Sequence, residues 1–570
     1  MSRSAEWDQE VDLLVMGAGA AGMTTALVAS LEGLKPLLLE KSQHVGGTTA
    51  TSAGTIWIPG NRPSAAAGFS DSAQAAATYM DHLIAKADTQ GVRSAYLATG
   101  PDMVDYLQAK TAVQFVPSGR HPDYRSLEGA AVTGRALAPA TFDGRLLGAD
   151  FERVRPPIAE FMVLGGMMAG KEDIPRLIHR FKSWSNFVYA GKLFARYLMD
   201  RLSYSRGTRV VMGNALVARL FYSLKQQQVP IWFDTSVQSL IQDNGRVVGV
   251  VVSQAGSQLR IRTRQGLVIA TGGYGHHAEM RAQFMPKPTP PYTLACASNT
   301  GDGLTLGLAA GGQVAAQTQG PGAFWTPVSV THRRDGTQGL YPHLSLDRAK
   351  PGLIAVNSAG QRFVNEADSY HDFVQAMFAS HQHVPTMPAY LMCEKSFVAR
   401  YGLGAVYPGI TDLRAFEATG YLVVAPTLEG LAAKLSIDPV ALQTTLERYN
   451  QMARQGRDLD FGKGDSELNR FNGDATQQPN PCLRPIEQGP FVAVAVWPAE
   501  IGTSTGLQAN ADGQVLDVQG QAVPGLYVVG NDMNSIMEGT YPGPGTTLGP
   551  ALTFGYRAAQ HAAAQARQTH

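Results

Sequence analysis

Three glycines near the N-terminus, Gly17, Gly19 and Gly22, follow a short apolar run and form the spacing G-x-G-x-x-G. At this spacing the first glycine permits a tight turn, the second lets the backbone approach a pyrophosphate, and the third lets the next helix pack closely on the sheet. The N-terminus of that helix directs free N–H groups at the phosphates. A second apolar run, residues 36–39, ends in Glu40, whose carboxylate can accept hydrogen bonds from ribose hydroxyls. The sequence therefore predicts a dinucleotide-binding site.

A second stretch of small and hydroxylated residues extends this site. Such residues let the backbone approach a second part of a long ligand. The stretch consists of Lys41, Gly46, Gly47, Thr48, Thr49, Ser52 and Gly54. It resembles the flavoprotein subunit family of fumarate reductase and succinate dehydrogenase, and this resemblance implies FAD along the whole cradle.

Later segments of the chain return to the same predicted site. An apolar run ends in Ala270-Thr271-Gly272, a turn that is common in flavoproteins with a two-dinucleotide fold. Another run leads to Gly530 and Asn531, and the last predicted helix begins near Thr547. The expected FAD-binding residues are Gly17, Gly19, Ala20, Ala21, Gly22, Glu40, Lys41, Gly46, Gly47, Thr48, Thr49, Ser52, Gly54, Ala270, Thr271, Gly272, Gly530, Asn531, Thr547 and Leu548.

The loop that precedes this last helix is the most specific stretch of the chain. Pro542 and Pro544 stiffen it, while its glycines leave backbone N–H groups uncovered. N–H donors in front of a helix N-terminus can bind a carbonyl oxygen or the pyrimidine oxygen of a flavin.

Here the chain resembles the 3-ketosteroid dehydrogenases, especially the Δ1-dehydrogenases. In that family a Tyr-Pro-x-x-Gly loop holds the steroid 3-keto oxygen, and the matching positions are Tyr541 and Gly545. Residues 354–370 resemble the stretch that ends in the family's base, which implies that role for Tyr370. Residues 115–148 resemble the loop whose tyrosine hydrogen-bonds the base, which implies that role for Tyr124.

The implied reaction removes a proton and a hydride from the saturated C1–C2 bond beside a ketone. Donors at the ketone oxygen acidify the C2 proton by stabilising the developing enolate. A phenolate-like base then takes this proton, while flavin N5 takes the C1 hydride. Because the pKa of tyrosine is about 10 in water, we expect Tyr124 and the oxidised flavin to lower the pKa of Tyr370.

Two related reactions and one non-catalytic role are alternatives. A fumarate reductase-like enzyme would clamp carboxylates with arginine and histidine, but residues 537–556 contain no arginine. A 3-ketosteroid Δ4(5α)-dehydrogenase, which oxidises another bond of the same ring, stays open beside the Δ1 reaction. A flavin-binding or membrane-recruiting module without catalysis is disfavoured by the base and donor set.

The length of the chain and the order of its predicted segments indicate which domains position these residues. With 570 residues, at least two domains are expected. We predict an α/β, Rossmann-like FAD-binding domain that is interrupted by an inserted α+β catalytic domain. The FAD-binding domain takes residues 7–322 and resumes at 490–570 with a return segment and the C-terminal helix, and the catalytic domain takes residues 323–489.

Composition narrows the class of protein and of partner. A hydrophobic content of 44% and a charged content of 16% are typical of a globular protein, and a net charge of +1 gives no general case for nucleic acid. The three cysteines are far apart, so neither a metal site nor a disulfide framework is expected. The first ten residues are polar and no apolar run reaches the length of a membrane span. We expect a cytoplasmic enzyme.

Residues 160–209 allow two interpretations. Phe181, Trp184, Phe187, Phe194 and Tyr197 recur at roughly helical spacing among many basic residues. Either two amphipathic helices pack their apolar face into the core, or the stretch rests on the inner membrane surface and meets anionic lipids. The second interpretation would let the enzyme draw a 3-ketosteroid from lipid. The sequence does not identify the electron acceptor, for which a quinone is one candidate.

Overall fold

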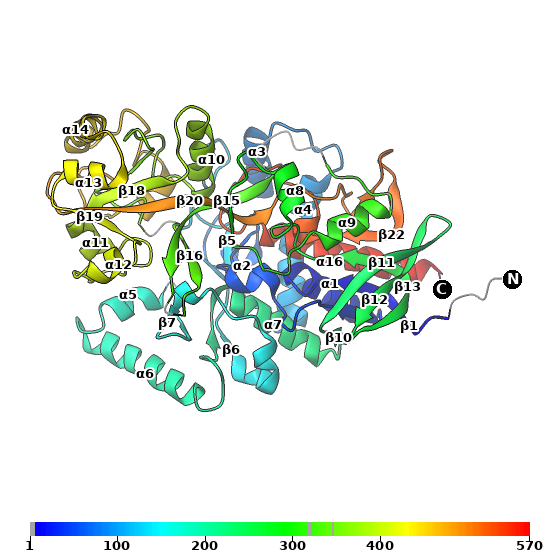
Figure 1. The fold of residues 1–570 in the computed structure, drawn as a ribbon. Helices are drawn as coiled ribbons and strands as arrows, with labels where there is room; N and C mark the ends of the chain where they lie inside the picture. The colour runs from blue at the N-terminus through cyan, green and yellow to red at the C-terminus, as the bar shows by residue number, and fades with distance from the viewer. Residues whose placement is uncertain (1–5, 171, 316–321, 334, 345–346, 570) are drawn as a thin grey trace.

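The first apolar run of the chain becomes β1 (Gln9–Met16), a buried strand of an eight-stranded sheet (Figure 1). The computed structural model describes residues 6–170, 172–315, 322–333, 335–344 and 347–569. Parallel strands flank β1 in the order β10 (Ile231–Trp232), β2 (Pro36–Leu39), β1, β13 (Ser257–Ile269) and β22 (Ala522–Val528). Since this sheet is covered on both faces, its strands are continuous apolar runs.

Antiparallel strands complete this sheet, and helices cover it. β11 (Thr235–Asp243) and β12 (Arg246–Gln254) extend β13 as a ribbon, and β21 (Gln514–Leu516) pairs with β22. The buried helix α1 (Ala20–Leu31) packs on α16 (Leu548–Thr569) and α7 (Met212–Gln226), and α16 also contacts α4 (Val92–Lys110). The other helices of this part are α2 (Arg62–Ala66), α3 (Ala73–Leu83), α8 (Ala278–Phe284) and α9 (Asp302–Ala309).

A seven-stranded sheet forms the second layer of strands. Its order is β16 (Gln338–Pro342), β15 (Ala323–His332), β20 (Phe491–Thr503), β18 (Ala389–Glu394) and β17 (Leu353–Val356). Two short strands, β14 (Tyr292–Thr293) and β19 (Val423–Ala425), also pair with β20. Its helices are α10 (Tyr370–His381), α11 (Lys395–Tyr401), α12 (Arg414–Ala418), α13 (Leu428–Leu435), α14 (Pro439–Gln455) and α15 (Glu467–Asn472).

The α/β architecture predicted from the sequence is confirmed, but the strand at the predicted boundary belongs to the other sheet. We placed residues from 490 onward in the returning FAD-binding segment, whereas β20 pairs with β15 and β18 of the second sheet. By sheet membership the chain returns to the first sheet only at β21. A central strand buried on both faces is a continuous apolar run in either sheet, so the sequence could not distinguish the two positions.

Three small sheets lie outside the two large ones. β3 (Ile56–Trp57), β5 (Ala136–Pro139) and β4 (Phe115–Pro117) form a three-stranded sheet, β6 (Phe142–Asp143) pairs with β9 (Arg209–Val210), and β7 (Met162–Val163) pairs with β8 (Met167–Met168). Residues 160–209 contain α5 (Asp173–Ile178) and α6 (Trp184–Asp200), which extend away from both sheets in Figure 1. Over the ranges described, no helix has the length and apolar composition needed to cross a bilayer.

Candidate active site

A cavity with about 1000 Å³ of open space lies where the parallel strands of the first sheet end. Its walls include Met16 and Gly17 after β1, Leu39 and Glu40 after β2, and Ala270 after β13. The carboxyl ends of parallel strands are where open α/β sheets bind ligands. Every expected FAD-binding residue lines this cavity except Gly22, Gly46 and Gly54.

These three glycines pack the walls of the cavity without lining it. A Cβ atom on Gly22 would lie 1.9 Å from the Gly17 carbonyl oxygen, so only glycine lets α1 sit this close to the turn. A Cβ on Gly54 would lie 2.7 Å from the Gly213 backbone nitrogen, and one on Gly46 would lie 2.9 Å from the Val217 side chain. We expect their effect on FAD to be indirect, through the shape of the cavity.

Polar groups at two places in the cavity suit a dinucleotide. The Glu40 carboxylate, at the end of β2, accepts hydrogen bonds from the backbone N–H groups of Ala18 (2.9 Å) and Ser42 (2.8 Å). Beside it, the backbone N–H groups of Gly19 and Ala21 find no acceptor among the described residues. Free N–H groups at the start of α1 can bind phosphate oxygens, and the fixed carboxylate can accept from a ribose.

The turn at Thr271 is held by a buried carboxylate. Asp532 accepts hydrogen bonds from the N–H groups of Gly272 (2.9 Å) and Gly273 (3.2 Å) and from the Thr271 hydroxyl (2.9 Å). Burial raises the pKa of Asp532, and its hydrogen bonds favour the ionised form. This contact joins the returning segment after β22 to the turn after β13.

Several lining residues were not expected from the sequence. They come from the start of β11, from the segment before α9, from β20 and from α16, and they are Thr235, Ser236, Val237, Ser298, Asn299, Asp302, Ile501 and Ala551. Only the Asn299–Gly303 stretch, rich in glycine and small polar residues, carried a local signal. Asp302 pairs with the expected residue Lys41 at 2.8 Å, a contact between segments far apart in the chain.

The cavity fits FAD on the geometry of this chain alone. Gly17 has a φ of +105°, and a Cβ there would lie 2.3 Å from the Ala270 carbonyl oxygen, so the tight turn requires glycine. A Cβ on Gly19 would meet no protein atom, because this residue faces the cavity. A smaller cavity of about 340 Å³ shares Gly530, Asn531, Thr547 and Ala551 with the first and reaches Phe324.

The three tyrosines expected to be catalytic lie together beside Phe324. The ring of Tyr541 stacks on that of Tyr124 at a centroid distance of 5.6 Å and meets the Tyr370 ring edge-on at 5.3 Å. The Tyr124 hydroxyl donates to the Tyr370 hydroxyl at 3.4 Å. The Phe324 ring contacts Tyr541 at 5.2 Å, which places the tyrosines next to the smaller cavity.

Backbone contacts explain why Tyr124 meets the loop of Tyr541. The Pro542 carbonyl accepts a hydrogen bond from the Tyr124 backbone N–H (2.8 Å) and another from the Tyr79 hydroxyl (2.8 Å). The neighbouring Asp123 is buried and bound by Arg135 at 2.6 Å. Tyr370 comes from a third segment, as the first residue of α10.

Gly545, four residues after Tyr541 in the same loop, presents a free backbone donor. It has a φ of +97°, and a Cβ there would lie 2.5 Å from the Thr55 carbonyl oxygen, so only glycine fits. Its carbonyl accepts from the Trp57 N–H at 3.3 Å, whereas its own N–H has no acceptor in the part of the chain that the structure describes. An unpaired backbone N–H can bind a carbonyl oxygen.

The protein groups do not lower the pKa of the base tyrosine in the way we expected. Loss of hydration raises the pKa of Tyr541 to about 12 and raises that of Tyr370 well above 10. The contacts with Tyr124 and Tyr541 raise the pKa of Tyr370 further instead of lowering it. The ionised form of Tyr370 therefore has to be stabilised by a positive charge or a hydrogen-bond donor in addition to these protein groups.

His371 was missed from the sequence and lies against the same ring. Its imidazole is 5.7 Å from the Tyr541 ring and 5.9 Å from Phe324. Burial lowers the pKa of His371 to about 4, so it is neutral at physiological pH. The walls around Tyr541 are thus aromatic and uncharged.

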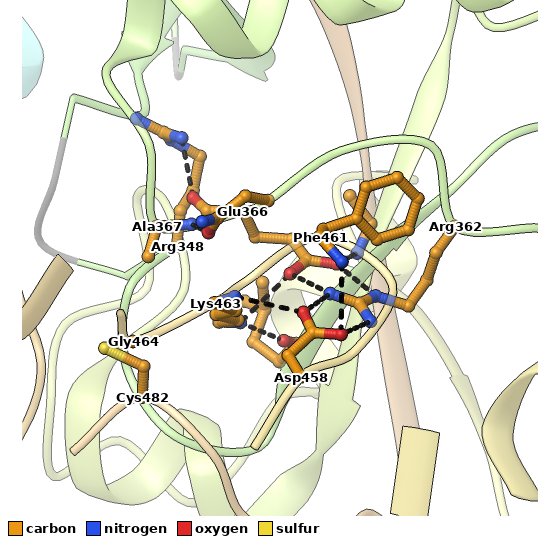
Figure 2. A network of polar contacts seen from close by, with 12 residues as sticks. Arg348, Arg362, Glu366, Ala367, Asp458, Phe461, Lys463, Gly464 and Cys482 are labelled. Atoms are coloured by element: carbon orange, nitrogen blue, oxygen red, sulfur yellow. Dashed lines mark hydrogen bonds and ion pairs between the residues drawn. The ribbon is translucent and has the colours of Figure 1, made fainter. Parts of the chain in front are cut away.

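The segment that leads into Tyr370 is held by a buried ionic network (Figure 2). Glu366 accepts hydrogen bonds from Arg362 at 2.9 Å and lies 3.3 Å from the Lys463 ammonium, while Arg362 also binds Asp458 at 2.8 Å. Burial opposes ionisation, but Arg362 and Lys463 hold the pKa of Glu366 at about 2. The carbonyl of Glu366 in turn accepts from Arg348 at 2.8 Å. Residues 362–369 are thereby fixed without regular secondary structure.

Known proteins resemble the chain over nearly its whole length. The family model described as an FAD binding domain matches residues 12–548. A 4-oxocyclohex-2-ene-1-carboxylate 5-dehydrogenase of Sinomonas cyclohexanicum is 36% identical over 97% of this chain and 93% of its own, and a 3-oxosteroid 1-dehydrogenase of Mycolicibacterium smegmatis is 34% identical over 98% of both. The crystal structure of 3-ketosteroid Δ1-dehydrogenase from Sterolibacterium denitrificans, in complex with 1,4-androstadiene-3,17-dione, has a TM-score of 0.90 and 35% identity, covering 98% of this chain and 100% of that one.

Proposed function

The chain belongs to the family of FAD-binding oxidoreductases that includes the 3-ketosteroid dehydrogenases, and we propose that it introduces the C1–C2 double bond into 3-ketosteroids. The observation that carries this proposal is the cluster of Tyr124, Tyr370 and Tyr541, together with the free N–H of Gly545 in the loop of Tyr541. This cluster adjoins the cavity that fits FAD. Like its relatives, the protein is an FAD-dependent flavoprotein.

The proposed roles follow from what each group can donate or accept. The Tyr541 hydroxyl and the Gly545 N–H bind the 3-keto oxygen and stabilise the enolate-like charge that develops there. The Tyr370 oxygen takes the C2 proton, and the Tyr124 hydroxyl orients this oxygen. Bound FAD supplies the acceptor for the C1 hydride. With FAD bound, the oxidised ring and the polarised ketone would supply the favourable interactions that ionised Tyr370 does not receive from the protein groups.

A neutral steroid suits this site better than a small oxo acid. The relative that acts on 4-oxocyclohex-2-ene-1-carboxylate has a carboxylated substrate, and a buried carboxylate needs a cation or several donors. Around Tyr541 the contacting rings are Tyr124, Phe324, Tyr370 and the neutral His371. Aromatic, uncharged walls favour an apolar fused-ring ketone.

Anaerobic flavin bleaching tests the proposal. The holoenzyme is mixed separately with a 4-ene-3-ketosteroid, a 3-keto-5α-steroid, 4-oxocyclohexanecarboxylate and succinate, and the flavin absorbance and the position of the new double bond are measured. We expect bleaching by the steroids, with the new double bond between C1 and C2. A new C4–C5 double bond in the 5α-steroid would instead favour the Δ4(5α) reaction, and bleaching by the oxo acid alone would overturn the steroid proposal.

We further propose that α6 rests on an anionic membrane surface. Its apolar side chains do not join the core: Phe181 before the helix is 78% exposed, Trp184 is 77% exposed and Leu202 after it is 85% exposed. Trp184, Phe187, Phe194 and Leu198 share one helical face, and Trp184 stacks on Phe187 at 5.6 Å.

The charges around this face are complementary to anionic lipid. Five exposed basic residues of the segment have no carboxylate partner among the described residues, namely Arg176, Arg180, Lys182, Lys192 and Arg201. Lys171 lies outside the described residues. Each basic residue near an anionic surface contributes about 1 kcal/mol. On this proposal the enzyme works at the inner face of the cytoplasmic membrane, where a quinone can reoxidise it.

Liposome co-sedimentation tests the membrane proposal. Replacing Phe181, Trp184 and Phe187 by serine removes the exposed aromatic cluster, while the ion pair of Asp173 with Arg209 (2.8 Å) still holds the base of the segment. We expect the wild type to sediment with anionic vesicles at low salt and the triple variant to stay in the supernatant. The matched control replaces the exposed Val440, Leu459 and Val518 by serine and should bind as the wild type does. A wild type that never sediments would refute the contact.

A further inference from the structure

A second small cavity is lined on one side by Tyr124 and Tyr370 and is separate from the FAD cavity. It has about 350 Å³ of open space and is lined by His121, Tyr124, Leu344, Arg348, Ala349, Glu366, Ala367, Asp368, Ser369, Tyr370, Leu468 and Asn472. None of these residues lines the FAD cavity. The part of this space open to the centre of a water molecule is about 30 Å³, and one water needs about 10–15 Å³ of it, so the cavity admits water. His121 and Asn472 are half-buried, so the cavity reaches toward solvent.

Asp368 is the carboxylate of this cavity that can accept a proton. The Asn469 amide donates to its Oδ1 at 3.1 Å, and Oδ2 has no donor among the described residues. The other acid of the cavity, Glu366, is bound by Arg362 and Lys463 and cannot serve. Arg348 fixes the main chain at this point because it donates to the Asp368 carbonyl at 3.1 Å.

The surroundings of Asp368 bring the pKa of its carboxyl group close to neutral pH. Burial raises its pKa to about 6, and the other contributions come from Asn469 of α15, Asp372 of α10, Arg125 of the early loop and Arg348. Asp372 is itself paired with Arg125 at 2.6 Å. The remaining titratable groups that face the cavity are His121, Tyr124 and Tyr370.

We infer that this cavity is the route by which the proton taken by Tyr370 leaves the enzyme, with Asp368 as the group that receives it. The inference rests on the proposed function. In each turnover the C2–H bond breaks, its electron pair forms the new C1–C2 bond, and the proton joins the Tyr370 oxygen, while the C1 hydride leaves with its pair to the flavin. The proton then passes from Tyr370, through Tyr124 and water in the cavity, to Asp368 and on to solvent, and Tyr370 is again able to accept.

Asp368 acts through the tyrosines, as a positioning and relay residue. Its test therefore needs a measurement, such as the pH profile of kcat, that would not change if Asp368 only supported the structure. In the holoenzyme Asp368→Asn keeps the shape and the acceptor for Asn469. We expect kcat to fall at least about tenfold, as the loss of an acid–base group does, with KM and FAD content unchanged. The kcat profile of the wild type should decline below about pH 6, where Asp368 becomes protonated, and the variant should lose this limb.

Two further proteins control the experiment. Asp368→Glu retains a carboxylate and should restore most of kcat together with an acid limb. Asp465→Asn makes the same chemical change at an exposed residue outside the cavity and should behave as the wild type. In an anaerobic stopped-flow experiment with a pH indicator, proton release should follow flavin bleaching without delay in the wild type and lag behind it in Asp368→Asn.

The outcomes separate this inference from the proposed function. An Asp368→Asn variant with wild-type kcat and an unchanged acid limb would overturn the relay and leave the dehydrogenase proposal standing. If Asp368→Asn loses FAD or unfolds, the wild-type profile decides, because a profile without an acid limb near pH 6 overturns the relay. A wild type whose flavin no 3-ketosteroid bleaches would overturn both, since there would be no C2 proton to export.

Discussion

Replacing Glu366 by glutamine should destabilise the protein although this residue contacts no expected substrate. The pKa of Glu366 falls from 4.5 in the unfolded chain to about 2 in the fold, despite burial. Each tenfold change in proton affinity corresponds to about 1.4 kcal/mol, so the ionised carboxylate contributes about 3 kcal/mol to folding at neutral pH. Glu366→Gln forfeits this contribution, leaves Arg362 with Asp458 as its carboxylate partner, and removes the carboxylate that pairs with the Lys463 ammonium.

Differential scanning calorimetry at a fixed scan rate, with saturating FAD, measures the effect. About 3 kcal/mol corresponds to a fall of about 6–12 °C in the unfolding transition of a domain of about 150–250 residues, the size range of the predicted catalytic domain that contains Glu366. The pH dependence has a defined sign. Because the folded pKa lies below the unfolded one, the stabilisation is complete above about pH 4.5 and is lost as the pH falls toward 2. The gap between wild type and variant should stay constant from pH 8 to 5 and narrow below that.

Glu467→Gln is the matched control for this prediction. Glu467 pairs with Arg120, but the two side chains are 43% and 55% exposed, and exposed ion pairs contribute less than about 1 kcal/mol. The control should shift the transition by no more than about 4 °C. If Glu366→Gln melted with the control at pH 7, the buried network would not stabilise the segment before Tyr370 in the way we describe.

The remaining predictions concern the cofactor and the tyrosines. Tyr370→Phe and Tyr541→Phe should each lower turnover at least about 100-fold with FAD content unchanged, and near-native turnover of both on the best 3-ketosteroid would refute the mechanism. Gly22→Ala should lose FAD by absorbance, because its Cβ would lie 1.9 Å from the Gly17 oxygen; Gly191→Ala, which would meet no atom within 4 Å, should retain it. FAD should be non-covalent, so acid precipitation should release the yellow colour, and a yellow pellet would contradict this.

The sequence determined the features that depend on neighbours along the chain. The spacing of Gly17, Gly19 and Gly22 and the acid at Glu40 predicted the cradle because a strand, a turn and a helix follow one another there. The sheet to which β20 belongs could not be predicted in this way, since a strand buried on both faces has no periodicity that distinguishes one sheet from another.

Resemblance nominated the tyrosines, but only the tertiary structure brought them together. Tyr124 and Tyr370 are separated by 246 positions and meet because the Pro542 carbonyl binds the early loop and the ionic network fixes the segment before α10. Contacts of this range leave no periodic pattern in a single sequence.

Burial was also beyond the reach of the sequence. The amphipathic pattern of α6 fitted both a core helix and an exposed one, and the fold decided for exposure by extending α6 away from both sheets. Asp368 carried no motif at all; the cavity and the surrounding charges give it a pKa of about 6. A pattern records which side chains are apolar or charged, whereas desolvation and charge proximity depend on which distant segments surround them.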